Sequence, residues 1–153
     1  MITYQGYPRQ YGPPGIRNTV LVISGDLCCN QWSKEIAAPF DNCYALTHKH
    51  GVGNYAPDRR LFLRLISGIT VNPNVAGFVL VSSGNEDHTV EEIAATAKKA
   101  GRKFHVVSAK DIKNTATLLR RGKKYAGQLV KYASDTERVK TGIENLRIGL
   151  NCA

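Results

Sequence analysis

The run Thr19-Val-Leu-Val-Ile-Ser24 decides the fold class of this chain of 153 residues. Its apolar residues are consecutive rather than alternating, which is typical of a strand buried on both faces of a parallel sheet. Three further runs of the same kind predict strands at residues 43–47, 76–83 and 104–108. The first run therefore predicts a sheet that is covered by helices on both sides.

Helical patterns occupy the intervals between these strands. A short helix is expected to begin at Asn30 as its N-cap, and a second is expected to begin at Pro57. Thr89 with Glu92 forms a capping-box pattern for a third helix, and a long fourth helix should begin at Asp111 or Asn114. Strands that alternate with helices predict right-handed βαβ units. The expected fold is therefore α/β, a Rossmann-like three-layer parallel sheet with helices on both faces.

The organisation of the chain follows from these patterns. Residues 1–18, rich in Gly, Pro, Tyr and Arg, predict an extended arm before an α/β domain at residues 19–134. Residues 135–153 predict a polar linker and then the strand 146–150, Leu-Arg-Ile-Gly-Leu. We interpret this last strand as the beginning of a C-terminal domain that the chain lacks.

Charge and composition limit the function classes. The net charge of +9 favours anionic partners, but most basic residues fall on predicted helices, as on ordinary solvated surfaces. Steering of a small carboxylate substrate is the functional alternative, and no motif supports nucleic-acid binding. The sequence contains no apolar run of about 18 residues for a membrane helix, and its start does not resemble a signal peptide. We therefore expect a cytoplasmic protein with no membrane contact, whose cysteines are reduced.

Polar loops follow three of the predicted strands, at residues 25–30, 48–54 and 84–88. Ligands of parallel sheets bind beyond the carboxyl ends of the strands, so these loops should form one rim. Imidazole and carboxylate groups suit an Fe(II) or Mn(II) site with open positions, although two surface histidines remain the alternative. No nucleotide-binding glycine motif and no serine-hydrolase motif is present. The residues expected on the rim are Asp26, Cys28, Cys29, Asn30, His48, His50, Asn54, Asn85, Glu86, Asp87 and His88.

An ordered set of short motifs carries a family resemblance. The set is Gly12-Pro-Pro-Gly-Ile-Arg-Asn18, Asp26-Leu-Cys-Cys-Asn30, His48-Lys-His-Gly51, Asn72-Pro-Asn-Val75 and Gly84-Asn-Glu86. Together these motifs resemble the altronate/galactarate dehydratase family, which includes the large subunit of (2R)-sulfolactate sulfo-lyase. The similarity runs from about Gly6 to Cys152 and covers the central domain of that family.

The resemblance implies a metal-assisted lyase that removes water or sulfite from a hydroxy acid, with a sugar acid such as altronate or galactarate as substrate. It implies a homo-oligomer, together with a C-terminal domain and a small SAF-type domain that are missing or separately encoded. It assigns catalysis to His48, His50 and Glu86. It assigns substrate binding to Arg17, Asn18, Asn30, Gly51 and Asn85, and metal binding to Cys28, His48, His50 and Glu86.

Two positions depart from the family pattern. Val52 and Asn85 stand where the family usually has cysteine. A thiolate is a soft metal ligand, and valine cannot bind a metal at all. These departures favour an alternative, a divergent non-catalytic member that binds a small carboxylate or a partner subunit. Without its C-terminal domain, the chain is expected to have no lyase activity.

Overall fold

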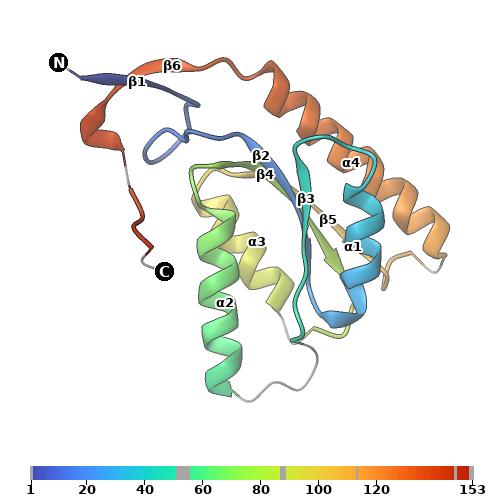
Figure 1. The fold of residues 1–153 in the computed structure, drawn as a ribbon. Coiled ribbons are helices and arrows are strands. Elements are labelled where there is room, and N and C mark those ends of the chain that lie inside the picture. Colours follow the sequence, from blue (N-terminus) through green and yellow to red (C-terminus); the bar gives the residue numbers. More distant parts are fainter. Residues whose placement is uncertain (1, 51–55, 87–88, 113, 147, 152–153) are drawn as a thin grey trace.

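Four parallel strands form the central sheet in a computed structural model that describes residues 2–50, 56–86, 89–112, 114–146 and 148–151. They are β2 (Thr19–Ser24), β3 (Cys43–Leu46), β4 (Val75–Ser82) and β5 (Lys103–Ser108), in the order β3-β2-β4-β5 (Figure 1). Every residue of β4 is buried, because it lies between two strands and between two helical layers. The predicted parallel sheet is confirmed.

Helices cover both faces of this sheet. On one face, α1 (Asn30–Ala37) and α4 (Thr115–Asp135) pack against the side chains of Val20, Val22 and Val79. On the other face, α2 (Ala56–Thr70) and α3 (Thr89–Lys99) pack against Ile23 and Leu80. Because neighbouring strand residues point to opposite faces, the apolar runs supply both cores. The predicted three-layer architecture is confirmed.

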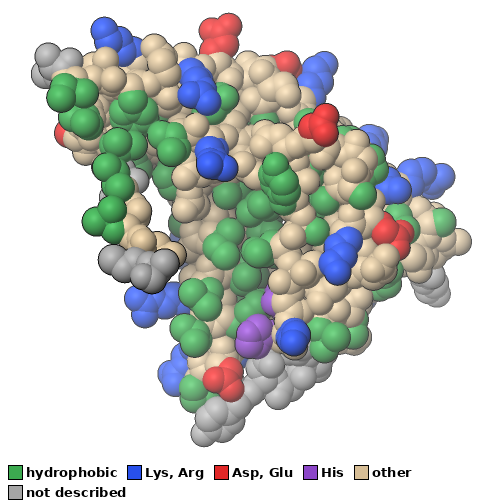
Figure 2. All heavy atoms as spheres, viewed as in Figure 1, with side chains coloured by type: hydrophobic (Ala, Val, Ile, Leu, Met, Phe, Trp, Pro, Cys, Tyr) green, Lys and Arg blue, Asp and Glu red, His purple; other side chains and the backbone are tan. Residues whose placement is uncertain are grey.

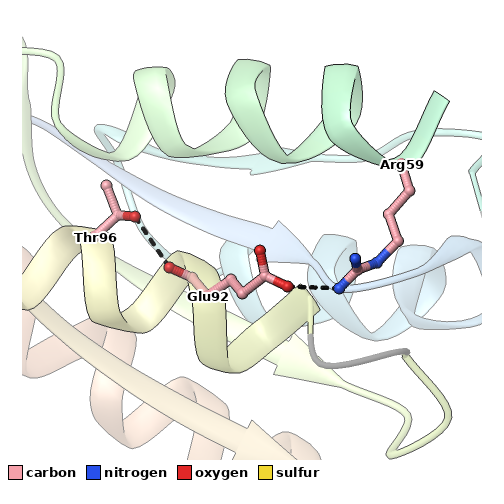
Figure 3. A network of polar contacts seen from close by, with 3 residues as sticks. All are labelled: Arg59, Glu92 and Thr96. Atoms are coloured by element: carbon pink, nitrogen blue, oxygen red, sulfur yellow. Dashed lines mark hydrogen bonds and ion pairs between the residues drawn. The ribbon is translucent and has the colours of Figure 1, made fainter. Parts of the chain in front are cut away.

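An exposed ion pair joins the two helices of the second face. Arg59 Nη2 lies 2.5 Å from Glu92 Oε1, and the Thr96 hydroxyl donates to the backbone oxygen of Glu92 at 3.0 Å (Figure 3). Lys and Arg side chains are scattered over the face seen in Figure 2, as expected for solvated helix surfaces. Among the described residues, no helix is both long and apolar enough to cross a bilayer.

The two ends of the chain differ from expectation. β1 (Thr3–Gly6) pairs with β6 (Val139–Gly142) in an antiparallel ribbon, with a 3₁₀ turn, η2 (Ile143–Asn145), after it. The sequence predicted an extended arm and a polar linker there, and it did not predict the pairing that joins them. Neither segment is apolar enough to predict a strand alone, since each is stabilised by pairing with a segment more than a hundred residues away.

The described residues of the predicted strand at 146–150 are not in a strand. Leu146 and residues 148–150 have no strand partner among the described residues, and Ile148 and Leu150 are 75% and 92% exposed. A strand needs a neighbour to satisfy its backbone hydrogen bonds, and the described part of the chain offers none at this position. The assignment of this segment to a further domain stays a prediction.

Candidate functional site

The loops that follow β2, β3 and β4 meet at the carboxyl edge of the sheet. The Gly25 N–H donates to the Val81 oxygen at 2.7 Å, which joins the ends of β2 and β4. The Leu27 N–H donates to the His50 oxygen, also at 2.7 Å, which joins the loops after β2 and β3. The convergence expected from the sequence is therefore present for the described part of these loops.

Three side chains from two of these loops form a compact group. Ligand atoms of Asp26, Cys29 and Glu86 all lie within 4.8 Å of one another. We call these three residues the rim cluster. Asp26 is 2% exposed, Cys29 is fully buried and Glu86 is half-buried. Two carboxylates and a thiol at this spacing are a plausible ligand set for a divalent cation.

Hydrogen bonds fix the Asp26 carboxylate. Its Oδ1 accepts from the Cys29 N–H at 3.1 Å, and the Ser83 hydroxyl donates to Oδ2 at 2.5 Å. The first bond caps the 3₁₀ turn η1 (Leu27–Cys29), and the second ties the loop after β2 to the loop after β4. Asp26 therefore shapes the rim as well as contributing a charge to it.

The Glu86 carboxylate is held by the turn that ends β4. Its Oε1 accepts from the Ser83 N–H at 2.6 Å, and its Oε2 accepts from the Gly84 N–H at 2.9 Å and the Ser82 hydroxyl at 3.0 Å. A Cβ atom on Gly25 would lie 2.6 Å from Glu86 Oε1. A glycine is therefore needed at position 25 for this carboxylate to approach the cluster.

The thiol of Cys29 is neutral in this environment. Burial raises its pKa far above the ordinary value, and the charge of Asp26 raises it further. A bound cation would reverse this effect, because metal-bound thiols lose their proton. The chemistry of the donor set therefore fits a metal, with the thiol proton released on binding.

His48 and His50 lie beside the cluster on the loop after β3. His48 Nε2 is 2.8 Å from the Ser24 carbonyl oxygen, so this nitrogen carries the proton and donates. Its Nδ1 is buried with no hydrogen-bond partner among the described residues. The His48 ring meets Phe62 edge-on at 4.5 Å between centroids, and the exposed His50 ring lies 5.2 Å from Phe62. Histidine side chains reach the molecular surface in Figure 2.

The predicted metal set of Cys28, His48, His50 and Glu86 is not brought together as one ligand group. Cys28 is exposed, whereas its neighbour Cys29 is buried in the rim cluster. The two imidazole rings, 5.9 Å apart, contact each other and Phe62 and are not members of the cluster. Of the four predicted ligands, only Glu86 belongs to it.

Two predicted substrate-binding residues lie at the other edge of the sheet. Arg17 and Asn18 precede β2, whose six residues span about 20 Å, so they are that far from the rim. Asn18 is buried and donates to the Ala133 oxygen at 2.7 Å, while its own oxygen accepts from Arg9 at 2.8 Å. Within this chain the two residues are therefore separated from the histidines, because residues before a parallel strand and residues after it lie at opposite edges of the sheet. Their assignment to substrate binding stays a prediction.

The remaining predicted residues have mixed placements. The Asn30 side chain does not cap α1; its Nδ2 donates to the His48 oxygen at 2.7 Å and so positions the histidine loop. Asn85 is exposed, and its N–H donates to the Ser83 hydroxyl at 3.3 Å. Five residues that the sequence analysis singled out lie outside the described residues, namely Gly51, Val52, Asn54, Asp87 and His88.

Comparison with known proteins gives a consistent result. Residues 6–134 match a family described as D-galactarate dehydratase/Altronate hydrolase, second domain. The chain is 29% identical over 152 residues to the (2R)-sulfolactate sulfo-lyase subunit beta of Chromohalobacter salexigens, covering 98% of this chain and 38% of that protein. It is 22% identical over 162 residues to the altronate dehydratase of Bacillus subtilis, covering 98% and 32%. No solved structure matches. The chain thus spans about a third of the length of these relatives.

Proposed function

Because the chain belongs to the family of the second domain of D-galactarate dehydratase and altronate hydrolase, we propose that it is the α/β part of a lyase for hydroxy acids. The substrate class proposed is a sugar acid such as altronate or galactarate, or the related sulfolactate. The reaction removes a proton from the carbon beside the carboxylate and expels water or sulfite from the next carbon. The rim cluster, together with the two adjacent histidines, is the observation that supports this proposal.

The proposed metal ligands are the rim cluster residues Asp26, Cys29 and Glu86. A divalent cation bound there, Fe(II) or Mn(II), supplies the positive charge that stabilises negative charge developing on the substrate. The cluster holds its carboxylates by hydrogen bonds from the backbone and from serine hydroxyls, so they are oriented before any ligand arrives. This arrangement favours a cation site with remaining positions for substrate.

The histidines have separate proposed roles. His50 is exposed at the rim, so its imidazole is the group proposed to take up the substrate proton. His48 is a positioning residue, because its Nε2–H is held by the Ser24 oxygen and its ring contacts both Phe62 and His50. The net charge of +9 supports an anionic substrate, since it raises the local concentration of carboxylates.

The active site is proposed to be completed by polypeptide outside this chain. The chain corresponds to only 38% and 32% of its two relatives, so the remainder of those proteins has no counterpart here. We propose that a C-terminal domain and a SAF-type domain, missing or separately encoded, cover the rim in a cytoplasmic homo-oligomer. The alternative is a non-catalytic member that binds a small carboxylate or a partner subunit, and Asn85 in place of the family cysteine favours it.

Metal binding by two adjacent cysteine variants tests the ligand set. Cys29→Ser should weaken Mn(II) binding at least about tenfold, because a buried ligand is lost, whereas Cys28→Ser should leave binding unchanged. Isothermal titration under anaerobic conditions measures both, and metal content after purification gives a second reading. Loss of binding in Cys28→Ser alone would restore the ligand set predicted from the sequence and contradict the rim cluster.

Activity tests the rest of the proposal. The chain should show no turnover of altronate, galactarate or sulfolactate with Fe(II) or Mn(II), and should gain turnover when mixed with the missing portion of a relative. Elimination needs a base, an acid and charge stabilisation in one closed site, and the rim alone supplies part of this set. Turnover by the chain alone would contradict the incomplete site, and metal binding without turnover in any mixture would favour the non-catalytic alternative.

A further inference from the structure

A basic hollow lies at the amino edge of the sheet, opposite the rim cluster. It has a volume of about 290 Å³, and its lining includes Arg9, Lys98, Arg102, Lys103, Phe104 and Tyr132. We call this hollow the arginine pocket. It contains no Asp or Glu among the described residues that line it. The eight residues of β4 separate the two edges by about 25 Å, so the pocket is independent of the proposed lyase site.

Two half-buried guanidinium groups face this pocket without a carboxylate. Arg102 donates from Nη2 to the Val71 oxygen at 2.6 Å, and its Nε is buried with no hydrogen-bond partner among the described residues. Arg9 donates from Nε to the Pro73 oxygen at 2.7 Å. Every hydrogen-bond acceptor of Arg9 and Arg102 among the described residues is neutral. Hydrogen bonding therefore fixes the two groups without supplying an opposite charge.

The pKa of each guanidinium group is lowered, which reflects the cost of holding its charge in this place. Burial lowers the pKa of Arg9, and the positive charge of Arg102 lowers it further. Burial likewise lowers the pKa of Arg102. Half-buried charges of one sign, held close together, are normally compensated by an opposite charge. An anion in the pocket would supply it.

The local backbone brings the arm of the chain to the pocket. Gly101 has a φ of +63°, and a Cβ atom there would lie 2.6 Å from Gln10 Oε1. This glycine therefore permits the turn after α3 to contact the segment that carries Arg9. Lys103 Nζ lies 4.7 Å from the centre of the Tyr132 ring and adds a further charge beside an aromatic face.

We propose that the arginine pocket binds a phosphate group, either free orthophosphate or the phosphate of a small monoester. Guanidinium groups donate paired hydrogen bonds to phosphate oxygens, and a dianion matches the excess of positive charge better than a single carboxylate does. An adjoining hollow of about 400 Å³ shares Phe104 and Tyr132 and adds His105 and Leu129 to its lining. The organic part of a monoester would lie there, against aromatic and apolar side chains.

Titration of the full chain with phosphate at constant ionic strength, kept by chloride, tests this proposal. Amide shifts in NMR spectra should saturate and should be confined to residues 9–10, 98–104 and 132. Adenosine monophosphate is the monoester probe. Tighter binding than orthophosphate supports the monoester form, and equal binding supports free phosphate. A short single-stranded oligonucleotide that binds when neither small ligand does would overturn the proposal in favour of a nucleic-acid surface.

Two variants that remove the same charge distinguish phosphate binding in the arginine pocket from attraction by the overall positive charge of the protein. Arg102→Gln should weaken phosphate binding at least about tenfold, because it removes a charged hydrogen-bond donor. Arg121→Gln removes the same charge from an exposed position on α4 and should change binding less than about twofold. If Arg102→Gln does not fold, the exposed Lys103→Gln provides the test, with an expected loss of about threefold. Absence of saturable binding, or an equal loss in the Arg121 variant, would overturn the proposal.

Discussion

Replacement of Asp26 by Asn should have opposite effects on stability in the absence and in the presence of a divalent cation. Asp26 and Glu86 have ligand atoms within 4.8 Å of each other, and Cys29 completes the group as a neutral thiol. Two carboxylates at this distance repel when no cation lies between them. The variant removes that repulsion and also removes a proposed metal ligand, so the two effects can be read separately.

The magnitudes follow from the distances. At an effective dielectric constant near 20, two unit charges 4.8 Å apart repel by about 3.5 kcal/mol. Solvent at the half-buried Glu86 screens part of this. The asparagine Oδ1 still accepts from the Cys29 N–H, whereas its Nδ2 cannot accept from the Ser83 hydroxyl and must instead donate to the hydroxyl oxygen. Both contacts lose their charge assistance, at about 1 kcal/mol each. In a chelator, the variant should therefore be more stable than the wild type by about 1 kcal/mol.

Urea unfolding measures this difference, with the fluorescence of the single tryptophan, Trp32, and circular dichroism as probes. A cation at 100 times its Kd stabilises the wild type by about 2.7 kcal/mol, and the variant should gain at least about 1.4 kcal/mol less. The order of stability then reverses when Mn(II) replaces the chelator. A variant that is less stable than the wild type in chelator would show that the carboxylate of Asp26 acts mainly as a cap, and would refute the repulsion argument.

Three further predictions concern the packing and the titration of the fold. Gly122→Ala should destabilise the protein by about 1–3 kcal/mol, because the new Cβ would lie 2.3 Å from Ile36 Cδ1. Gly68→Ala, with open space around the new Cβ, should stabilise it by about 0.5–1 kcal/mol. Thermal unfolding measures both changes. Burial raises the pKa of Cys43 from 9.0 to about 11, so between these values the folded state keeps a proton that the unfolded state loses. The free energy of unfolding should therefore fall as the pH rises from 9 to 11. Cys43→Ala should lessen this fall, which urea titrations at about pH 8 and about pH 10 measure. Gly25→Ala should weaken Mn(II) binding, since the added methyl group displaces the Glu86 carboxylate of the rim cluster. A lowered melting temperature with unchanged Mn(II) binding would contradict the importance of that contact for the cluster.

The sheet was predictable because burial on both faces leaves a plain signal in the sequence. The run predicted at 19–24 is β2, and the run predicted at 76–83 is β4 shifted by one residue. The β1–β6 ribbon was not predictable in the same way. Its strands are short and largely polar, and their register pairs Thr3 with Gly142. No local sequence pattern therefore predicts that these two segments pair.

The site was predictable as a location and less so as a set of ligands. All the rim residues follow strands, so topology alone brings them to one edge. The choice between Cys28 and Cys29 depends on the phase of a 3₁₀ turn, in which neighbouring residues point about 120° apart. That turn directs Cys29 inward and Cys28 to solvent, and its phase is set by the capping carboxylate of Asp26. Recognition of Asp26 as a cap would have been the signal for the correct cysteine.

The placement of charge at the rim bears on how an anionic substrate could reach it. The protein as a whole carries an excess of nine positive charges, yet the rim cluster presents two carboxylates and a neutral thiol. A carboxylate substrate would be attracted to the molecule and repelled from the cluster itself. A divalent cation would cancel the two carboxylate charges, and release of the thiol proton would add one negative charge balanced by the surrounding basic surface. The same three side chains can therefore attract a metal and, once neutralised, admit an acid, which is the order of binding that the charges require.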